Sequence, residues 1–135
     1  MRKTAGVFAG TGAGHSFKIR IFAIRKYNEI INITQIMVKH IVLFKLKETL
    51  SPAEKSDVMR RFKAAVESLP ERIACIRSIY VGLNMNPAEE WDICLEGVFD
   101  SLGDVKAYAV HPDHLAAAAI LKDAKCGRAC ADYEC

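Results

Sequence analysis

The chain of 135 residues contains no uninterrupted apolar stretch that approaches the roughly 20 residues of a membrane-spanning helix. It also lacks the apolar core of about 7–15 residues and the small-residue cleavage site of a secretory signal. We therefore predict neither a membrane protein nor a secreted one. With 51% apolar and 26% charged residues the composition is that of a globular protein, and the length fits one domain.

Disulfide and zinc frameworks are missing as well. The cysteines form an odd, scattered set in which the closest pair has CxxxC rather than CxxC spacing: Cys75, Cys94, Cys126, Cys130 and Cys135. In a strand, residues four apart lie about 13 Å from one another, too far to ligate one metal ion. Free thiols in a reducing cytosol fit this set best, so we predict a cytoplasmic protein without a metal or another cofactor.

Acidic residues are almost absent from residues 1–36, where Glu29 stands against six Lys and Arg. The remainder carries 13 basic and 15 acidic side chains, so it is mildly acidic and offers no electrostatic basis for binding nucleic acid. We interpret residues 1–36 as an N-terminal extension. It is either poorly ordered or the product of a start assigned too early, with Met37 as the natural start; an organelle transit peptide is the alternative.

The pattern of a folded domain begins at Met37 and continues over residues 37–135. Residues 38–47 form a run of strand length that is rich in β-branched and aromatic side chains. A helix follows, with Ser51 as its N-cap, a proline in its first position and Glu54 completing a capping box. We expect this helix to end at Pro70.

Two further strands and a second helical region are expected after Pro70. The strands cover Ile73 to about Leu83 and residues 91–100. Ser101 caps the next helix, which His111-Pro112 interrupts before a further helical stretch. A short last strand follows over residues 126–135. The order is therefore β-α-β-β-α-β, which is the ferredoxin-like arrangement of an α+β domain.

The first strand is apolar on both of its faces. One face carries Val42 and Phe44, and the other carries Ile41 and Leu43. An antiparallel sheet that is covered on one side shows a cleaner alternation, so this strand is expected to be covered on both. Since the fold supplies helices to one face of the sheet, we predict a homodimer in which a second copy covers the other.

Three motifs occur in order along the domain: VKHIVLFK at residues 38–45, HPDH at residues 111–114 and DYE at residues 132–134. With the order and spacing of the elements, they resemble the stress-responsive A/B barrel (Dabb) family over essentially all of residues 37–135. The resemblance implies a dimeric α/β barrel. In it two four-stranded sheets face one another, and the terminal strand crosses to the partner.

This family includes plant stress-associated proteins and a plant polyketide cyclase, and its wider superfamily includes small monooxygenases and haem-degrading enzymes. The cyclase works with a histidine of the first strand, a tyrosine near the end of the second helix and the second histidine of the HPxH motif. In this chain those positions hold His40, Tyr108 and His114. The resemblance thus implies that these three are the catalytic residues if the protein is an enzyme.

His40 is unusual on physical grounds alone, because it interrupts an apolar strand face. A buried imidazole that makes no hydrogen bond costs about 1–3 kcal/mol. One interpretation is a structural histidine bonded to a backbone carbonyl or to the HPxH loop. The other is a general base inside a cavity, with Tyr108 donating a hydrogen bond to a carbonyl of the substrate.

The remaining candidates are ligand-binding residues. Phe44, Trp91 and His111 are candidates for the lining of a pocket for a small apolar molecule. Aromatic residues on sheet faces are also typical of cores and dimer interfaces. In the same way His111 or Asp113 suits the capping of the helix that Pro112 begins.

Two functions therefore remain open. The leading hypothesis is a homodimeric Dabb-domain protein of unestablished activity that binds a small apolar ligand or acts in a stress response. The alternative is a small cyclase-like or monooxygenase-like enzyme that uses His and Tyr for acid-base chemistry on a carbonyl compound.

Overall fold

The computed structural model describes residues 36–135. The extension expected over residues 1–36 lies, except for Ile36, outside the described residues. The described part contains eight elements in the following order: β1 (Val38–Leu46), α2 (Pro52–Glu67), the 3₁₀ helix η1 (Leu69–Glu71), β2 (Ile76–Leu83), β3 (Ile93–Phe99), α3 (Leu102–Val110), α4 (Pro112–Ala119) and β4 (Lys125–Glu134). The predicted β-α-β-β-α-β order is confirmed, with the second helical region divided into α3 and α4.

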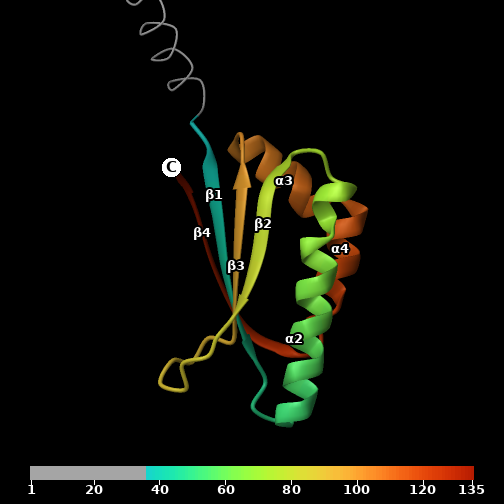
Figure 1. The fold of residues 1–135 in the computed structure, drawn as a ribbon, viewed down its shortest axis with the longest axis vertical. Coiled ribbons are helices and arrows are strands. Elements are labelled where there is room, and N and C mark those ends of the chain that lie inside the picture. Colours follow the sequence, from blue (N-terminus) through green and yellow to red (C-terminus); the bar gives the residue numbers. More distant parts are fainter. Residues whose placement is uncertain (1–35) are drawn as a thin grey trace, which may run out of the picture. The chain divides into compact units, whose positions relative to one another are not determined.

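The strands form one sheet in the order β2-β3-β1-β4, and every neighbouring pair is antiparallel (Figure 1). β1 lies inside the sheet, between β3 and β4. The resemblance implied that the last strand crosses to a partner. In the structure β4 pairs with β1 of its own chain along the whole of Val38–Leu46.

Helix α2 begins as the sequence predicts. The Ser51 hydroxyl accepts from the Glu54 backbone N–H at 3.1 Å, and the Glu54 carboxylate accepts from the Ser51 N–H at 2.7 Å. Strand β2 begins at Ile76, later than expected from the sequence. The Leu69 carbonyl accepts from the N–H groups of both Arg72 and Ile73, and this turn delays the return to the sheet.

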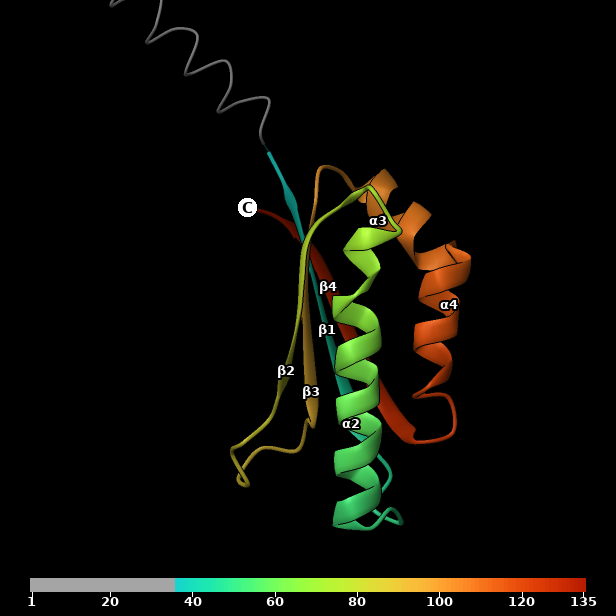
Figure 2. The ribbon, with the colours of Figure 1, turned by 45° about the vertical axis from the view of Figure 1, so that its right-hand side comes forward.

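The second helical region is broken at His111. This residue has an extended backbone, with φ −64° and ψ 135°, and it is followed by Pro112 in the first position of α4. Extended geometry before a proline is what steric clash with the proline ring demands. The break places α3 and α4 at an angle to one another, on the same side of the sheet (Figure 2).

The helices lie on one side of the sheet only, as the edge-on view in Figure 2 shows. We call this side the helix face; on β1 it carries the buried residues Val38, His40, Val42, Phe44 and Leu46. The other side, the open face, carries the half-buried residues Lys39, Ile41, Leu43 and Lys45 of the same strand. No helix within residues 36–135 is both long and apolar enough for a bilayer crossing.

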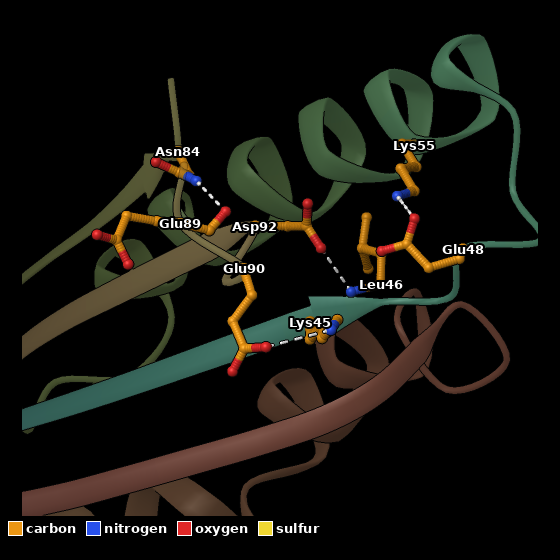
Figure 3. A network of polar contacts seen from close by, with 8 residues as sticks. All are labelled: Lys45, Leu46, Glu48, Lys55, Asn84, Glu89, Glu90 and Asp92. Atoms are coloured by element: carbon orange, nitrogen blue, oxygen red, sulfur yellow. Dashed lines mark hydrogen bonds and ion pairs between the residues drawn. The ribbon is translucent and has the colours of Figure 1, made fainter. Parts of the chain in front are cut away.

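Asp92 joins the ends of β1 and β3 (Figure 3). Its carboxylate accepts from the Leu46 N–H at 2.7 Å, a bond drawn in Figure 3. Its own N–H donates to the Phe44 carbonyl at 2.9 Å. Trp91 precedes the strand and lies over the open face, where its ring is the neighbour that a Cβ on Gly127 would meet at 3.6 Å. The register pairs Gly127 with Lys45, a residue of that face.

Candidate functional site

His40 is held at the centre of the helix face by the register of the sheet. It pairs with Gly97 of β3 on one side and with Asp132 of β4 on the other. A Cβ on Gly97 would lie 2.8 Å from the Phe99 ring, so the glycine leaves room for that ring. Phe99 in turn packs edge-on against the imidazole of His40, with 6.1 Å between ring centroids.

The His40 imidazole is bonded to a carboxylate and not to the backbone. The residue is 8% exposed, and its Nδ1 lies 2.5 Å from Oδ1 of Asp132. Because an ionised carboxylate can only accept, Nδ1 carries the proton and donates it to Asp132. In the neutral tautomer that carries this proton, the Nε2 atom is an acceptor, which is the form a general base requires.

Tyr108 on α3 brings a hydroxyl into the same region. The residue is 1% exposed, and its hydroxyl oxygen is the buried side-chain polar atom within residues 36–135 that has no hydrogen-bond partner. Burial raises the pKa of Tyr108 far above its usual value of 10.0, so the hydroxyl stays protonated and is a donor. A buried donor without an acceptor is unfavourable by about 1–3 kcal/mol.

His114, in the first turn of α4, stacks beside Tyr108. Their ring centroids are 4.3 Å apart, and Nδ1 of His114 lies 2.9 Å from the Ala109 carbonyl, to which it donates. Burial is the main cause that lowers the pKa of His114 from 6.5; the bond to Ala109 opposes this shift, and the neighbouring His40, Arg128 and His111 assist it. The ring is therefore neutral at pH 7, and its Nε2 is an acceptor.

A cavity of about 190 Å³ lies between the sheet and the helices, and His40, Tyr108 and His114 all line it. Most of its wall is apolar, with contributions from Val42, Phe44, Phe62, Val66, Leu95 and Ala118. Lys125 and Arg128 of β4 complete the lining. A depression of about 330 Å³ beside Trp91 is larger but less enclosed, and it lies away from all three residues.

The structure separates the predicted ligand-binding residues. Phe44 lines the cavity on the helix face. Trp91 lies over the open face, and the two aromatic rings therefore belong to opposite sides of the sheet. His111 acts as the N-cap of α4, where its Nδ1 accepts from the Asp113 N–H at 3.1 Å, and it does not line the cavity.

Two residues near His40 were not found by reasoning from the sequence. Asp132 orients the imidazole, and Cys130 places its Sγ 3.7 Å from His40 Nδ1. Both belong to β4, about 90 positions along the chain from His40, so no local spacing indicates their proximity. The signal that was available is the alternation of β4, which puts residues 130 and 132 on one face.

The site is thus a partly enclosed, mostly apolar cavity of a ferredoxin-like α+β domain, with a hydroxyl donor and two imidazoles in its wall. The chain belongs to the family described as the stress responsive A/B barrel domain (Dabb), whose model matches residues 38–135. The family resemblance inferred from the three sequence motifs is therefore confirmed.

Solved structures similar to this chain include two dimeric proteins of unknown function with a ferredoxin-like fold. One, from Bacteroides fragilis, is 57% identical, with a TM-score of 0.73, and the match covers 73% of this chain and 96% of that one. The other, from Thermobifida fusca, is 26% identical, with a TM-score of 0.63 and coverage of 74% and 92%. A curated relative is olivetolic acid cyclase from Cannabis sativa, 25% identical over 81 residues, which are 58% of this chain and 76% of the cyclase.

Proposed function

We propose that this Dabb domain works as a homodimer and binds a small, largely apolar molecule that carries a hydrogen-bond acceptor, such as a carbonyl oxygen. The observation that carries the proposal is the Tyr108 hydroxyl, which is buried in the cavity wall without a partner. A ligand oxygen would satisfy this donor and recover the roughly 1–3 kcal/mol that the unmade bond costs.

The size and lining of the cavity support a small ligand. Its volume of about 190 Å³ is below the roughly 300–1,000 Å³ of pockets that hold drug-sized molecules. The wall offers apolar contact from Phe44, Phe62 and Leu95, and hydrogen bonding from Tyr108 and the two histidines. A single ring with one polar substituent matches that combination.

The open face supports the homodimer. The two middle strands contribute the half-buried apolar residues Ile41, Leu43, Cys94 and Val98 to it, and Trp91 covers its end. One acidic residue, Glu96, lies among them opposite Ile41. A solvent-facing side of a sheet is usually polar, and a contiguous apolar patch marks an interaction surface. The 57% identical relative from Bacteroides fragilis is dimeric, which favours a second copy as the molecule that covers this face.

The ligand proposal is tested with acetophenone and ethylbenzene, which have similar shapes and differ by the carbonyl oxygen. Binding of each to the full chain is followed by chemical-shift changes of cavity residues. We expect the wild-type protein to prefer acetophenone and Tyr108→Phe to lose that preference, because the variant removes the donor and keeps the ring. Tyr133→Phe, at an exposed position on β4, is the matched control and should keep it. Equal preference in the wild type and Tyr108→Phe contradicts the proposal.

A second candidate is an enzyme that removes a proton next to a carbonyl group. The orientation of His40 by Asp132 and the free Nε2 of His114 favour it. In such a step Tyr108 donates a hydrogen bond to the carbonyl oxygen and one imidazole Nε2 takes the proton from the adjacent carbon. The C–H electron pair moves into the enolate, whose charge rests on the oxygen that Tyr108 contacts. The relationship to a cyclase supports this candidate.

The enzyme candidate is tested by the exchange of the methyl protons of acetophenone for deuterium in heavy water, followed by NMR. We expect exchange above the buffer rate with the wild-type protein and a loss of at least about 100-fold in His40→Ala or His114→Ala, since general-base catalysis contributes roughly 10²–10⁴-fold. A wild-type rate equal to that of buffer rejects the enzyme candidate for this ketone and leaves the binding proposal to its own test.

A further inference from the structure

We propose that His40, Cys130 and Asp132 form a binding site for a Zn²⁺ ion on the helix face, at the edge strand of the sheet. Among residues 36–135, these three are the group whose imidazole nitrogen, thiol sulfur and carboxylate oxygen all lie within 4.8 Å of one another. Zn²⁺ is bound in proteins by cysteine sulfur, histidine nitrogen and carboxylate oxygen, and this group offers one donor of each type.

The register of β1 and β4 produces this grouping. His40 pairs directly with Asp132, and Cys130 follows two residues earlier on β4, opposite Val42. Residues two apart in a strand point to the same side, so both β4 side chains lean toward the imidazole. The sheet thus fixes the backbone positions of all three donors, and their side chains need only local rotation.

The distances between the donor atoms are close to those around a tetrahedral ion. With Zn–S near 2.3 Å and Zn–N near 2.0 Å, two such donors lie ~3.5 Å apart. The observed distance between Cys130 Sγ and His40 Nδ1 is 3.7 Å. The hydrogen-bonded pair of His40 and Asp132 is tighter, at 2.5 Å, and has to open by about 1 Å so that the ion takes the place of the shared proton.

The donor set selects the kind of cation. Mg²⁺ and Ca²⁺ take oxygen ligands, and a thiolate beside an imidazole suits Zn²⁺. Three protein ligands leave a fourth position of the tetrahedron, as in zinc sites that keep one coordination position for water. Because Cys130 and Asp132 are exposed, solvent can reach that position.

Binding of the ion requires a defined movement of protons. The Cys130 thiol loses its proton to solvent and ligates as a thiolate. The proton on Nδ1 of His40 is released from that atom, and the ring keeps a proton on Nε2 instead. Neither Cys130 nor Asp132 lines the cavity with Tyr108, so His40 is the one residue that the zinc site shares with the cavity wall.

This site would overturn the prediction of a protein without a metal. That prediction compared Cys126 with Cys130 and excluded a shared ion because of their spacing. The structure supports a different combination, in which Cys130 is joined with a histidine and an aspartate that belong to two adjacent strands. Cys126 is then not a ligand, and it provides a control on the same strand.

The proposal is tested with Co²⁺ as a spectroscopic substitute for Zn²⁺, added to the reduced full chain without any histidine tag. We expect a saturable near-ultraviolet band from thiolate-to-cobalt charge transfer, with one ion bound per chain. Zn²⁺ should displace Co²⁺ and abolish the band. Cys130→Ser should remove the band, whereas Cys126→Ser, the matched control, should leave it unchanged.

A second measurement separates the site from loose binding by single residues. In calorimetric titrations with Zn²⁺, His40→Ala and Asp132→Asn should each weaken binding beyond the roughly 10–100-fold that loss of an outer-shell partner costs. The proposal fails if the cobalt band persists in Cys130→Ser or disappears in Cys126→Ser. It also fails if the wild-type chain binds neither ion at one equivalent.

The zinc and ligand proposals can fail separately. Cys130→Ser removes a zinc ligand and leaves the cavity wall intact, so the preference for acetophenone over ethylbenzene should persist in it. Tyr108→Phe removes the proposed ligand contact and leaves the three zinc donors intact, so its cobalt band should persist.

Discussion

The helix face and the open face of the sheet are built from alternate residues of the same strands, and they differ in burial. On β1 the helix face is fully buried, from Val38 to Leu46, whereas the open face is half-buried with Ile41 and Leu43 at its centre. The comparison shows that the domain covers one surface of its sheet with its own helices and leaves the other without a helix over it. Stability of the fold should depend on the first surface and assembly on the second.

The largest expected effect is the loss of stability from truncation on the helix face. Leu46→Ala should lower the free energy of unfolding by about 2–5 kcal/mol, because the side chain is fully buried and leaves a cavity. Leu43→Ala, on the open face of the same strand, should cost less when both are measured by denaturant unfolding of dilute protein. Equal losses of unfolding free energy in the two variants would mean that both faces contribute equally to the stability of a single chain.

A charge on the open face should break the dimer and spare the fold. Leu43→Asp should weaken self-association by at least about 100-fold, equivalent to roughly 3 kcal/mol, because an unpaired carboxylate would be buried between the copies. Sedimentation velocity measures the oligomeric state, and circular dichroism checks the fold. Leu115→Asp makes the same chemical change at an exposed position of α4 and should remain dimeric.

Two strand glycines provide a smaller and closely matched comparison. Gly97→Ala should destabilise the domain by about 1–3 kcal/mol, because the new methyl group would lie 2.8 Å from the Phe99 ring. Gly82→Ala meets no atom closer than 3.6 Å and should have a much smaller effect. Thermal unfolding of the two variants measures the difference, and a reversed order would contradict the packing around His40.

The smallest expected effect is on the pH dependence of stability. Because burial lowers the pKa of His114 below 6.5 in the folded protein, the unfolded chain binds this proton first as the pH falls. Its contribution is therefore complete above about pH 6.5 and is lost as the pH falls toward the folded pKa. His114→Gln should show a flatter decline of unfolding free energy between about pH 7 and pH 5. A decline as steep as that of the wild type would exclude His114 as its source.

Local chemistry made much of the fold predictable. The capping box at Ser51 and Glu54, the break at His111-Pro112 and the two-sided apolar character of β1 each depend on neighbouring residues, and each is present in the structure. The start of β2 was placed too early, because residues 73–75 still form a turn, in which the Ile76 N–H donates to the Ile73 carbonyl.

The candidate site was less accessible to prediction. The family resemblance pointed to His40, Tyr108 and His114, and the structure brings these three to one cavity. The hydrogen-bond partner of His40 was not predicted, because Asp132 lies 92 positions away in the sequence and is brought close by strand pairing. Alternation along residues 91–99 places Trp91 on the same face as Ile93 and Phe99, and this prediction was wrong. Trp91 precedes the regular part of β3, and its ring lies on the opposite face.

The pairing of β1 with β4 also constrains how the domain is made. β1 is the first strand of the domain to be synthesised and β4 is the last. The edge of β1 that pairs with β4 therefore stays unpaired until residues 125–134 have been synthesised. During that interval its free edge offers unpaired N–H and C=O groups beside the apolar side chains of two faces. A chain truncated before β4 would therefore expose an unpaired, aggregation-prone edge of β1. Completion of the sheet depends on the ten residues of β4.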